Sequence, residues 1–141
     1  MLDQGSPDAS SATVLLVEDD EELRDIVADL LEDGGYDVVP ARNGKQAIDY
    51  LTNARQMPAL ILLDLMMPIV NGWECLRVIK SDGRFASIPV VVTTANKGDR
   101  PPAVDAVLTK PFGVGDLLTT VLHFAGPSLA PMVESSAGSR S

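Results

Sequence analysis

Several residue types and patterns are scarce in this chain of 141 residues, and each scarcity excludes a class of protein. A single cysteine, Cys75, excludes an internal disulfide framework and a structural zinc site built from cysteines. Long apolar runs are missing as well, because the longest runs have the length of a buried strand and are too short to cross a membrane as a helix. We therefore expect a soluble protein with no membrane partner.

Basic charge is scarce too, since 11 Lys and Arg residues stand against 20 Asp and Glu residues and give a net charge of −9. No basic stripe appears along the chain, so direct binding to nucleic acid is not expected. The first twelve residues have neither the basic start nor the apolar stretch of a secretory signal. A cytoplasmic location is the resulting expectation.

The length of the chain suits one folded domain. Ser, Gly, Ala and Pro dominate both ends without apolar periodicity. We expect a disordered N-terminal tail at residues 1–11, one domain at 12–125 and a flexible C-terminal tail at 126–141. No output domain is expected after the folded part.

Short continuous apolar runs indicate strands that are buried on both faces of a parallel sheet. They lie at residues 13–17, 60–63 and 89–92, and residues 36–40 and 106–109 are weaker strand candidates. Between the runs, the apolar spacing becomes helical. Helices are predicted from Leu23 to the Gly34-Gly35 pair and at 44–52, 72–80 and 114–124. In the third of them, Trp73 and Cys75 are interpreted as packing residues.

Strands that alternate with helices require crossover connections and produce an open parallel sheet with helices on both faces. The predicted fold is therefore α/β and flavodoxin-like: a three-layer sandwich of five strand–helix repeats with the strand order 2-1-3-4-5. The connection at residues 96–105 lacks a helical apolar pattern and carries Pro101-Pro102. The fourth helix is thus expected to be short or absent.

Polar residues follow the predicted strands at the point where each strand ends. Glu18 and Asp19 follow the first strand, Asp64 the third, Thr94 the fourth and Lys110 the fifth. Because the carboxyl ends of parallel strands lie at one edge of a sheet, these residues are expected to meet in one pocket. The pocket would hold three carboxylates, one hydroxyl group and one ammonium group.

Carboxylates that lie close together repel one another, and a bound cation is the simplest remedy. Ligand sets made only of oxygen atoms favour Mg²⁺, which commonly joins protein carboxylates to phosphate oxygens. A carboxylate can also act as a nucleophile that forms an acyl phosphate, while a metal ion, a lysine and a hydroxyl group stabilise the transferring phosphoryl group. The residue types are therefore those of a phosphoryl-accepting site.

At these residues the chain resembles a known family. The segments VLLVEDD, LILLDLMMPIVNGWE, PVVVTTA and LTKPF are similar to the successive signature segments of response regulator receiver domains. The spacings agree with that family, because Pro68 and Gly72 lie four and eight residues after Asp64, and Thr94 lies thirty residues after it. The resemblance covers nearly all of the predicted folded part.

The resemblance implies a two-component switch rather than an enzyme that acts on an external substrate. Asp64 would accept a phosphoryl group from a sensor histidine kinase or a phosphotransfer protein, and the switch would signal to a downstream protein that the sequence does not identify. The resemblance also implies that a metal ion is held by Glu18, Asp19, Asp64 and the backbone carbonyl of Met66. Lys110 would pair with phosphoryl oxygens, and Thr94 would carry the switch hydroxyl. The Lys110-Pro111 bond would be cis.

Two features depart from the family pattern. Val107 stands where receiver domains usually carry Tyr, Phe or His, the ring that moves inward with the switch threonine, and the connection before it is shorter than is typical. The alternative hypothesis is therefore a pseudo-receiver, a constitutive protein interaction module that does not cycle phosphate. A third hypothesis, a nucleotide or flavin enzyme, lacks a glycine-rich phosphate loop after the first strand.

Each site residue also has a purely structural interpretation. Glu18 and Asp19, like Asp20, could cap the first helix, and Asp64 could belong to a turn. Thr94 could be an ordinary strand residue, and Lys110 a surface lysine. Of these, helix capping is the preferred interpretation for Asp20 alone.

Overall fold

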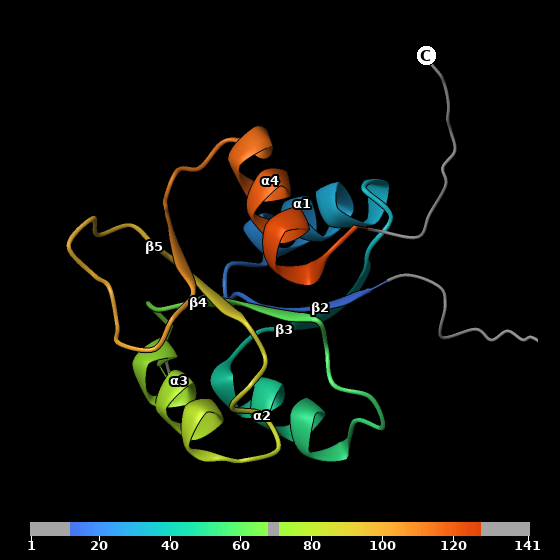
Figure 1. Ribbon diagram of the computed structural model, residues 1–141. Coiled ribbons are helices and arrows are strands. Elements are labelled where there is room, and N and C mark those ends of the chain that lie inside the picture. The colour runs from blue at the N-terminus through green and yellow to red at the C-terminus, as the bar shows by residue number, and fades with distance from the viewer. Residues whose placement is uncertain (1–11, 68–70, 128–141) are drawn as a thin grey trace, which may run out of the picture.

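Five parallel strands form one sheet in the order β3-β2-β4-β5-β6, which is the predicted order 2-1-3-4-5 counted along the chain (Figure 1). The structure is a computed structural model that describes residues 12–67 and 71–127. The strands are β2 (Thr13–Val17), β3 (Asp37–Ala41), β4 (Leu60–Asp64), β5 (Val90–Thr94) and β6 (Ala106–Thr109). The predicted α/β, flavodoxin-like fold is confirmed, and the predicted strand ends differ from the observed ones by at most two residues.

In the residues that the structure describes, four helices connect or follow the strands: α1 (Glu21–Asp33), α2 (Gly44–Asn53), α3 (Gly72–Ser81) and α4 (Val114–Ala125). The side chain of Asp20 caps α1 by accepting hydrogen bonds from the N–H groups of Glu22 and Leu23, as predicted. Gly35, whose φ is +95°, allows the chain to turn away from the end of α1. The predicted helices are thus confirmed.

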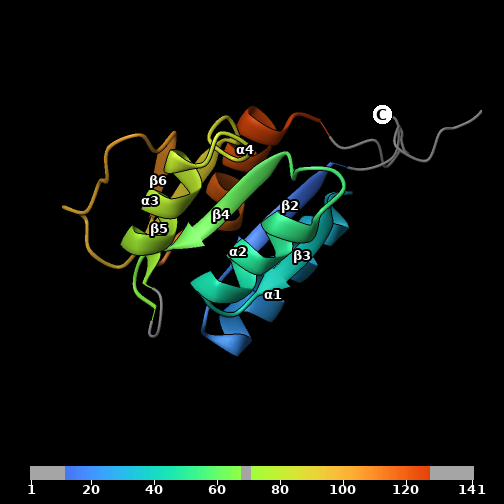
Figure 2. The ribbon, with the colours of Figure 1, turned by 90° about the horizontal axis from the view of Figure 1, so that it is seen from below.

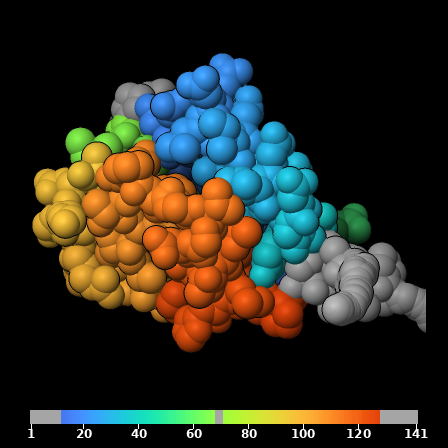
Figure 3. All heavy atoms as spheres, turned by 90° about the horizontal axis from the view of Figure 1, so that it is seen from above, coloured from blue at the N-terminus to red at the C-terminus, as the bar shows by residue number. Residues whose placement is uncertain are grey.

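The sheet is the middle of three layers. Helices α1 and α4 cover one face and α2 and α3 cover the other (Figure 1). Alternate residues of each strand point to opposite layers: Leu15 and Val17 of β2 pack in the core beneath α2 and α3, and Val14 and Leu16 pack in the core beneath α1 and α4. Figure 3 looks onto the second of these layers, where α1 (blue) and α4 (orange to red) lie side by side.

The connection between β5 and β6 contains no helix, as the two prolines predicted. It is joined to the sheet by Asp105, whose carboxylate accepts a hydrogen bond from the N–H of Val90 at 2.8 Å. Val104 and Val107 pack against the core beneath α3. The connection therefore runs beside α3, at the place where the fourth crossover helix was predicted to be short or absent (Figure 2).

Helix α3 begins in very close contact with the carboxyl end of β4. A Cβ atom added at Gly72 would lie 2.4 Å from the carbonyl oxygen of Asp64 and 2.4 Å from the Cα atom of Leu65. The N–H of Gly72 donates a hydrogen bond to the carbonyl of Leu65 at 3.1 Å. Only glycine fits at this point, and the contact fixes the position of the strand end that carries Asp64.

Some predictions fall outside the described residues. These are the predicted N-terminal tail at residues 1–11, residues 128–141 of the predicted C-terminal tail at 126–141, and Pro68. Residues 126 and 127 follow α4 and are not helical. Within the described part of the chain, no helix combines the length and the apolar character that crossing a membrane requires.

We expect Gly72→Ala to lower the free energy of unfolding by about 2 kcal/mol or more, because the new methyl group must displace backbone atoms of β4. Urea denaturation measures this change. The control is Gly115→Ala in α4, where no atom lies within 4 Å of the new Cβ and the better helix former is expected to add up to about 1 kcal/mol. Equal stability of Gly72→Ala and the wild type would contradict the prediction.

Candidate functional site

The polar residues that follow the strands meet at one edge of the sheet, as the parallel topology predicted. Glu18 follows β2, Asp64 and Thr94 are the last residues of β4 and β5, and Lys110 follows β6. Glu18 is 4% exposed, Asp64 2% and Thr94 0%. These side chains form a buried polar cluster at the end of an otherwise apolar sheet.

The ammonium group of Lys110 joins the two buried carboxylates. Its Nζ atom lies 3.0 Å from Oε1 of Glu18 and 3.4 Å from Oδ2 of Asp64. The backbone N–H of Lys110 donates to the carbonyl of Thr94 at 2.7 Å, and the Lys110-Pro111 bond is cis, as the resemblance implied. Two carboxylates therefore share one positive charge.

The acidic residues are close enough to hold a cation together. Glu18, Asp19 and Asp64 each offer an oxygen atom, and these three atoms lie within 4.8 Å of one another. Asp19 is exposed, so the cluster has a side that is open to water and to a further ligand. A set of carboxylate oxygens with an open side suits Mg²⁺, which keeps several water ligands. The carbonyl of Met66 as a further ligand stays a prediction.

Hydrogen bonds hold each buried carboxylate in place. Oδ1 of Asp64 accepts from the N–H of Met66 at 3.1 Å, and Oε2 of Glu18 accepts from the N–H of Asp20 at 3.2 Å. Arg24 donates to the backbone carbonyl of Glu18 at 2.8 Å and so ties α1 to the end of β2. Arg24 was not among the predicted site residues, because no local pattern distinguishes it from other polar residues of α1.

The electrostatic environment favours the protonated form of Asp64 when no metal is bound. Burial of the carboxyl group, the largest cause, and the nearby Glu18 together raise the pKa of Asp64 to about 7, against the lowering effects of the Met66 N–H and of Lys110. Burial by itself lowers the pKa of Lys110, but its hydrogen bond to Glu18 and the charge of Asp64 outweigh that effect and raise this pKa. Lys110 therefore remains a cation beside an acid that resists ionisation.

The hydroxyl group of Thr94 is bound to the connection between β5 and β6. Its Oγ1 atom accepts a hydrogen bond from the N–H of Asn96 at 3.1 Å and donates one to the carboxylate of Asp99 at 3.3 Å. Asp99 was not among the predicted site residues. Its only signal in the sequence is an acid five residues after Thr94 in a connection without helical periodicity.

The interpretation of Trp73 as a packing residue is wrong. Its side chain is 41% exposed, whereas Cys75 on the same helix is fully buried. Helical spacing places both residues on α3, but it does not tell which of them a neighbouring element covers.

Comparisons with known proteins agree with this geometry. Residues 14–122 match the sequence profile of the response regulator receiver domain. The response regulator Rre1 of Synechocystis sp. is 39% identical over 140 residues, which cover 94% of this chain and 58% of Rre1. The chain thus spans less than two thirds of the length of that relative.

Two further proteins are similar over most of their own length. The polar-differentiation response regulator DivK of Brucella anthropi is 35% identical over 81% of this chain and 96% of DivK. The receiver domain of the sensor histidine kinase PA1611 of Pseudomonas aeruginosa is 28% identical, with a TM-score of 0.75 over 83% of this chain and 99% of that domain. That crystal structure contains a magnesium ion coordinated in its active-site cleft.

We expect the metal-free protein to lose stability as the pH rises from about 4 to 7. The folded state keeps the proton of Asp64 up to a pKa of about 7, whereas the unfolded state releases it near the ordinary pKa of 3.8 for an aspartate. Over this range the unfolded state binds fewer protons, so the free energy of unfolding falls, by about 2 to 4 kcal/mol from this residue.

Thermal denaturation of the wild type and Asp64→Asn in EDTA, at pH 5 and pH 8, measures this effect as the difference between the two proteins. The variant should be the more stable one at pH 8, and its advantage should be much smaller at pH 5. Addition of Mg²⁺ at pH 8 should stabilise the wild type more than the variant. A difference between the two proteins that does not change with pH would refute the prediction.

Proposed function

Because this chain belongs to the response regulator receiver family, we propose that it accepts a phosphoryl group on Asp64 in a Mg²⁺-dependent reaction. The observation that carries the proposal is the buried Asp64 carboxylate, which lies 3.4 Å from the ammonium of Lys110 and within 4.8 Å of oxygens from Glu18 and Asp19. Receiver domains of two-component systems act as phosphoacceptor switches and bind Mg²⁺ at an acidic site.

The proposed reaction is a transfer between two nucleophiles. An oxygen of Asp64 forms a bond to phosphorus while the bond from phosphorus to the donor atom breaks, and the donor leaves with the electron pair of that bond. For a phosphohistidine donor the broken bond is P–N, and the imidazole nitrogen then takes up a proton from solvent. The product is an aspartyl phosphate.

The nucleophile must be ionised, although burial favours its protonated form. A bound Mg²⁺ supplies the positive charge that keeps Asp64 ionised and screens the phosphoryl oxygens. Lys110 contributes a second positive charge beside Glu18 and Asp64, and Thr94 has a hydroxyl proton to donate to a phosphoryl oxygen. We assign Glu18, Asp19, Asp64 and the carbonyl of Met66 as metal ligands.

Receiver domains exchange signals with histidine kinases and with downstream proteins. We propose a sensor histidine kinase or a phosphotransfer protein as the phosphoryl donor and a protein as the receiver of the signal. Phosphorylation would add about two negative charges at the edge of the sheet, which is enough to rearrange neighbouring segments.

The pseudo-receiver remains a second candidate, because two observations favour it. The ring that usually moves with the switch threonine is replaced by Val107, and the connection of residues 95–105 contains no helix. Against it stands the complete set of two buried carboxylates, an exposed carboxylate, a hydroxyl group and a lysine at one sheet edge.

Intact-mass analysis after incubation with acetyl phosphate and Mg²⁺ separates the two candidates. The wild type is expected to gain one phosphoryl group, whereas Asp64→Asn and a sample in EDTA are expected to gain none. Lys110→Ala should be phosphorylated about tenfold or more slowly, because one donor to the developing charge is lost. The control Lys45→Ala removes an exposed lysine that pairs with Asp49 and should leave the rate unchanged.

Failure of the wild type to gain a phosphoryl group from acetyl phosphate or from a phosphorylated histidine kinase would refute the phosphoacceptor function and favour the pseudo-receiver. Phosphorylation that persists in Asp64→Asn would instead refute the assignment of the acceptor.

A further inference from the structure

The short segment between β2 and α1 carries two of the proposed metal ligands, Glu18 and Asp19. Backbone hydrogen bonds hold both of its ends. The N–H of Glu18 donates to the carbonyl of Ala41 at 2.9 Å, and the carbonyl of Asp20 accepts from the N–H of Arg24 at 2.8 Å. A side chain also reaches the segment, because Nη1 of Arg24 donates to the carbonyl of Glu18 at 2.8 Å. Arg24 therefore contacts this segment through its backbone and through its guanidinium group.

The carbonyl of Glu18 depends on Arg24 for its hydrogen bond. Glu18 lies outside both β2 and α1, so neither the sheet nor the helix supplies a donor to this carbonyl. Among the described residues, Arg24 is the donor that it has. Because Glu18 is largely buried, loss of the guanidinium would leave a polar group without a partner, which proteins generally avoid.

This hydrogen bond fixes the direction in which the chain enters Asp19. The carbonyl of Glu18 and the N–H of Asp19 belong to one planar peptide unit, so the position of the oxygen sets the orientation of that plane. The N–H of Glu18 is already bonded to the end of β3. With bonds on both sides of its Cα atom, Glu18 has little freedom to rotate the peptide that follows it.

Asp19 is the proposed ligand that depends most on this backbone. The carboxylates of Glu18 and Asp64 each contact Lys110 and each accept a backbone N–H. The side chain of Asp19 is exposed and, within the described part of the chain, makes neither a hydrogen bond nor a salt bridge. Its place beside the other two carboxylates therefore follows from the course of the backbone.

The guanidinium group of Arg24 is not paired with an acid. Arg24 lies near the start of α1, is half-buried and precedes the buried Val27 by three residues, so it stands on the flank of the helix next to the sheet. It takes part in no salt bridge among the described residues, although α1 begins with Glu21 and Glu22. The bond to the Glu18 carbonyl is thus the polar interaction that the structure gives to this charge.

Electrostatic attraction does not explain an arginine at this position. A positive charge near a cation site repels the cation, so charge alone would make the site bind Mg²⁺ more tightly without Arg24. A favourable effect of Arg24 on metal binding must therefore come from geometry. Charge and geometry predict opposite signs for the same substitution, which makes them separable.

We propose that Arg24 is a positioning residue of the metal site. It orients the peptide between Glu18 and Asp19 and thereby directs the carboxylate of Asp19 at a cation held by Glu18 and Asp64, without contacting that cation itself. This inference deepens the proposed function and rests on it. Groups that orient metal ligands from behind generally lower the affinity for the metal when they are removed.

The test is calorimetric titration of Mg²⁺ alone into the full chain, without a phosphoryl donor. Arg24→Met keeps most of the apolar stem but loses the donor and the charge, and it should weaken Mg²⁺ binding by about tenfold. Arg24→Lys keeps the charge but lacks the planar fork, so its affinity should lie between those of Arg24→Met and the wild type.

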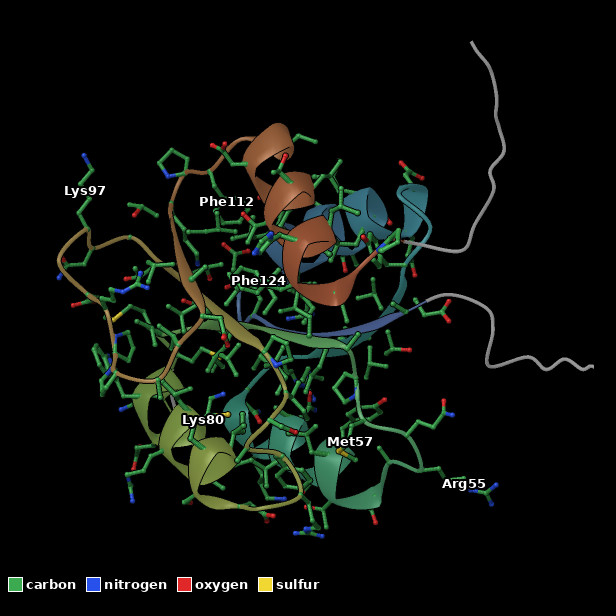
Figure 4. The ribbon with its side chains drawn as sticks, in the orientation of Figure 1. Arg55, Met57, Lys80, Lys97, Phe112 and Phe124 are labelled. Atoms are coloured by element: carbon green, nitrogen blue, oxygen red, sulfur yellow. The ribbon has the colours of Figure 1, made fainter. Side chains whose placement is uncertain are left out.

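The matched control is Arg55→Met. It removes an exposed arginine from the connection between α2 and β4, at the end of the parallel sheet opposite to the site (Figure 4). The affinity for Mg²⁺ should change by less than about twofold, because a distant surface charge is screened by salt.

An Arg24→Met variant that binds Mg²⁺ as tightly as the wild type, or more tightly, would overturn the proposal. Circular dichroism at the temperature of the titration shows whether each variant is folded. If Arg24→Met is unfolded, Arg24→Lys decides, and an affinity equal to that of the wild type would then overturn the positioning role.

The Asp19→Asn background tests whether Arg24 acts through Asp19. Because the ligand that Arg24 positions is lost there, adding Arg24→Met should weaken the remaining Mg²⁺ binding by less than about twofold. A loss of about tenfold in both backgrounds would show that Arg24 does not act through Asp19 and would overturn the assignment.

The outcomes for the wild type separate this inference from the proposed function. A wild type that binds no Mg²⁺ would refute the metal site and the positioning role together. A wild type that binds Mg²⁺ and gains a phosphoryl group, beside an Arg24→Met variant that binds Mg²⁺ equally well, would refute the positioning role alone.

The rate of phosphorylation at saturating Mg²⁺ gives a further criterion. Arg24→Met should then react with acetyl phosphate within about twofold of the wild-type rate, because excess metal compensates for weaker binding. A rate that stays about tenfold lower would mean that Arg24 acts on the transferring group, and would overturn the proposal.

Discussion

The carboxylates of Glu18 and Asp64 are held almost out of contact with solvent at the end of the sheet, and the Lys110 ammonium lies within 3.4 Å of both. Two buried negative charges against one positive charge leave an excess that the fold itself does not neutralise. Folding tolerates this arrangement because Asp64 can keep a proton, and a cation beside Glu18 and Asp19 would remove the need for it. Several surrounding elements hold Glu18, Asp64 and Lys110 close together.

That support comes from several elements. The parallel sheet brings the strand ends to one edge, the contact of Gly72 with β4 fixes the end that carries Asp64, and Arg24 holds the backbone of Glu18. The strand–helix alternation is interrupted between β5 and β6, where the connection contains no helix. There the Thr94 hydroxyl is hydrogen-bonded to Asp99, and an apolar groove lies between the connection and α3.

Local sequence patterns are informative only for features that form within a few residues of one another. The capping role of Asp20 and the missing helix at Pro101-Pro102 were predictable, because both follow from backbone geometry within a few residues. Trp73 was misjudged, because helical spacing reports which residues share a helix and does not report whether a neighbouring element covers them. Asp99 was missed, since its bond to Thr94 depends on the course of an irregular connection.

By itself, the sequence determined the order of strands and helices and the meeting of Glu18, Asp64, Thr94 and Lys110 at one sheet edge. Apolar periodicity sets the element type, and parallel pairing then places every carboxyl end on the same side. Only the tertiary structure decided the degree of burial of Asp64, the partner of the Thr94 hydroxyl and the groove beside Trp73. These properties depend on distances between segments that are remote in the sequence, and side-chain packing and local dielectric conditions set them.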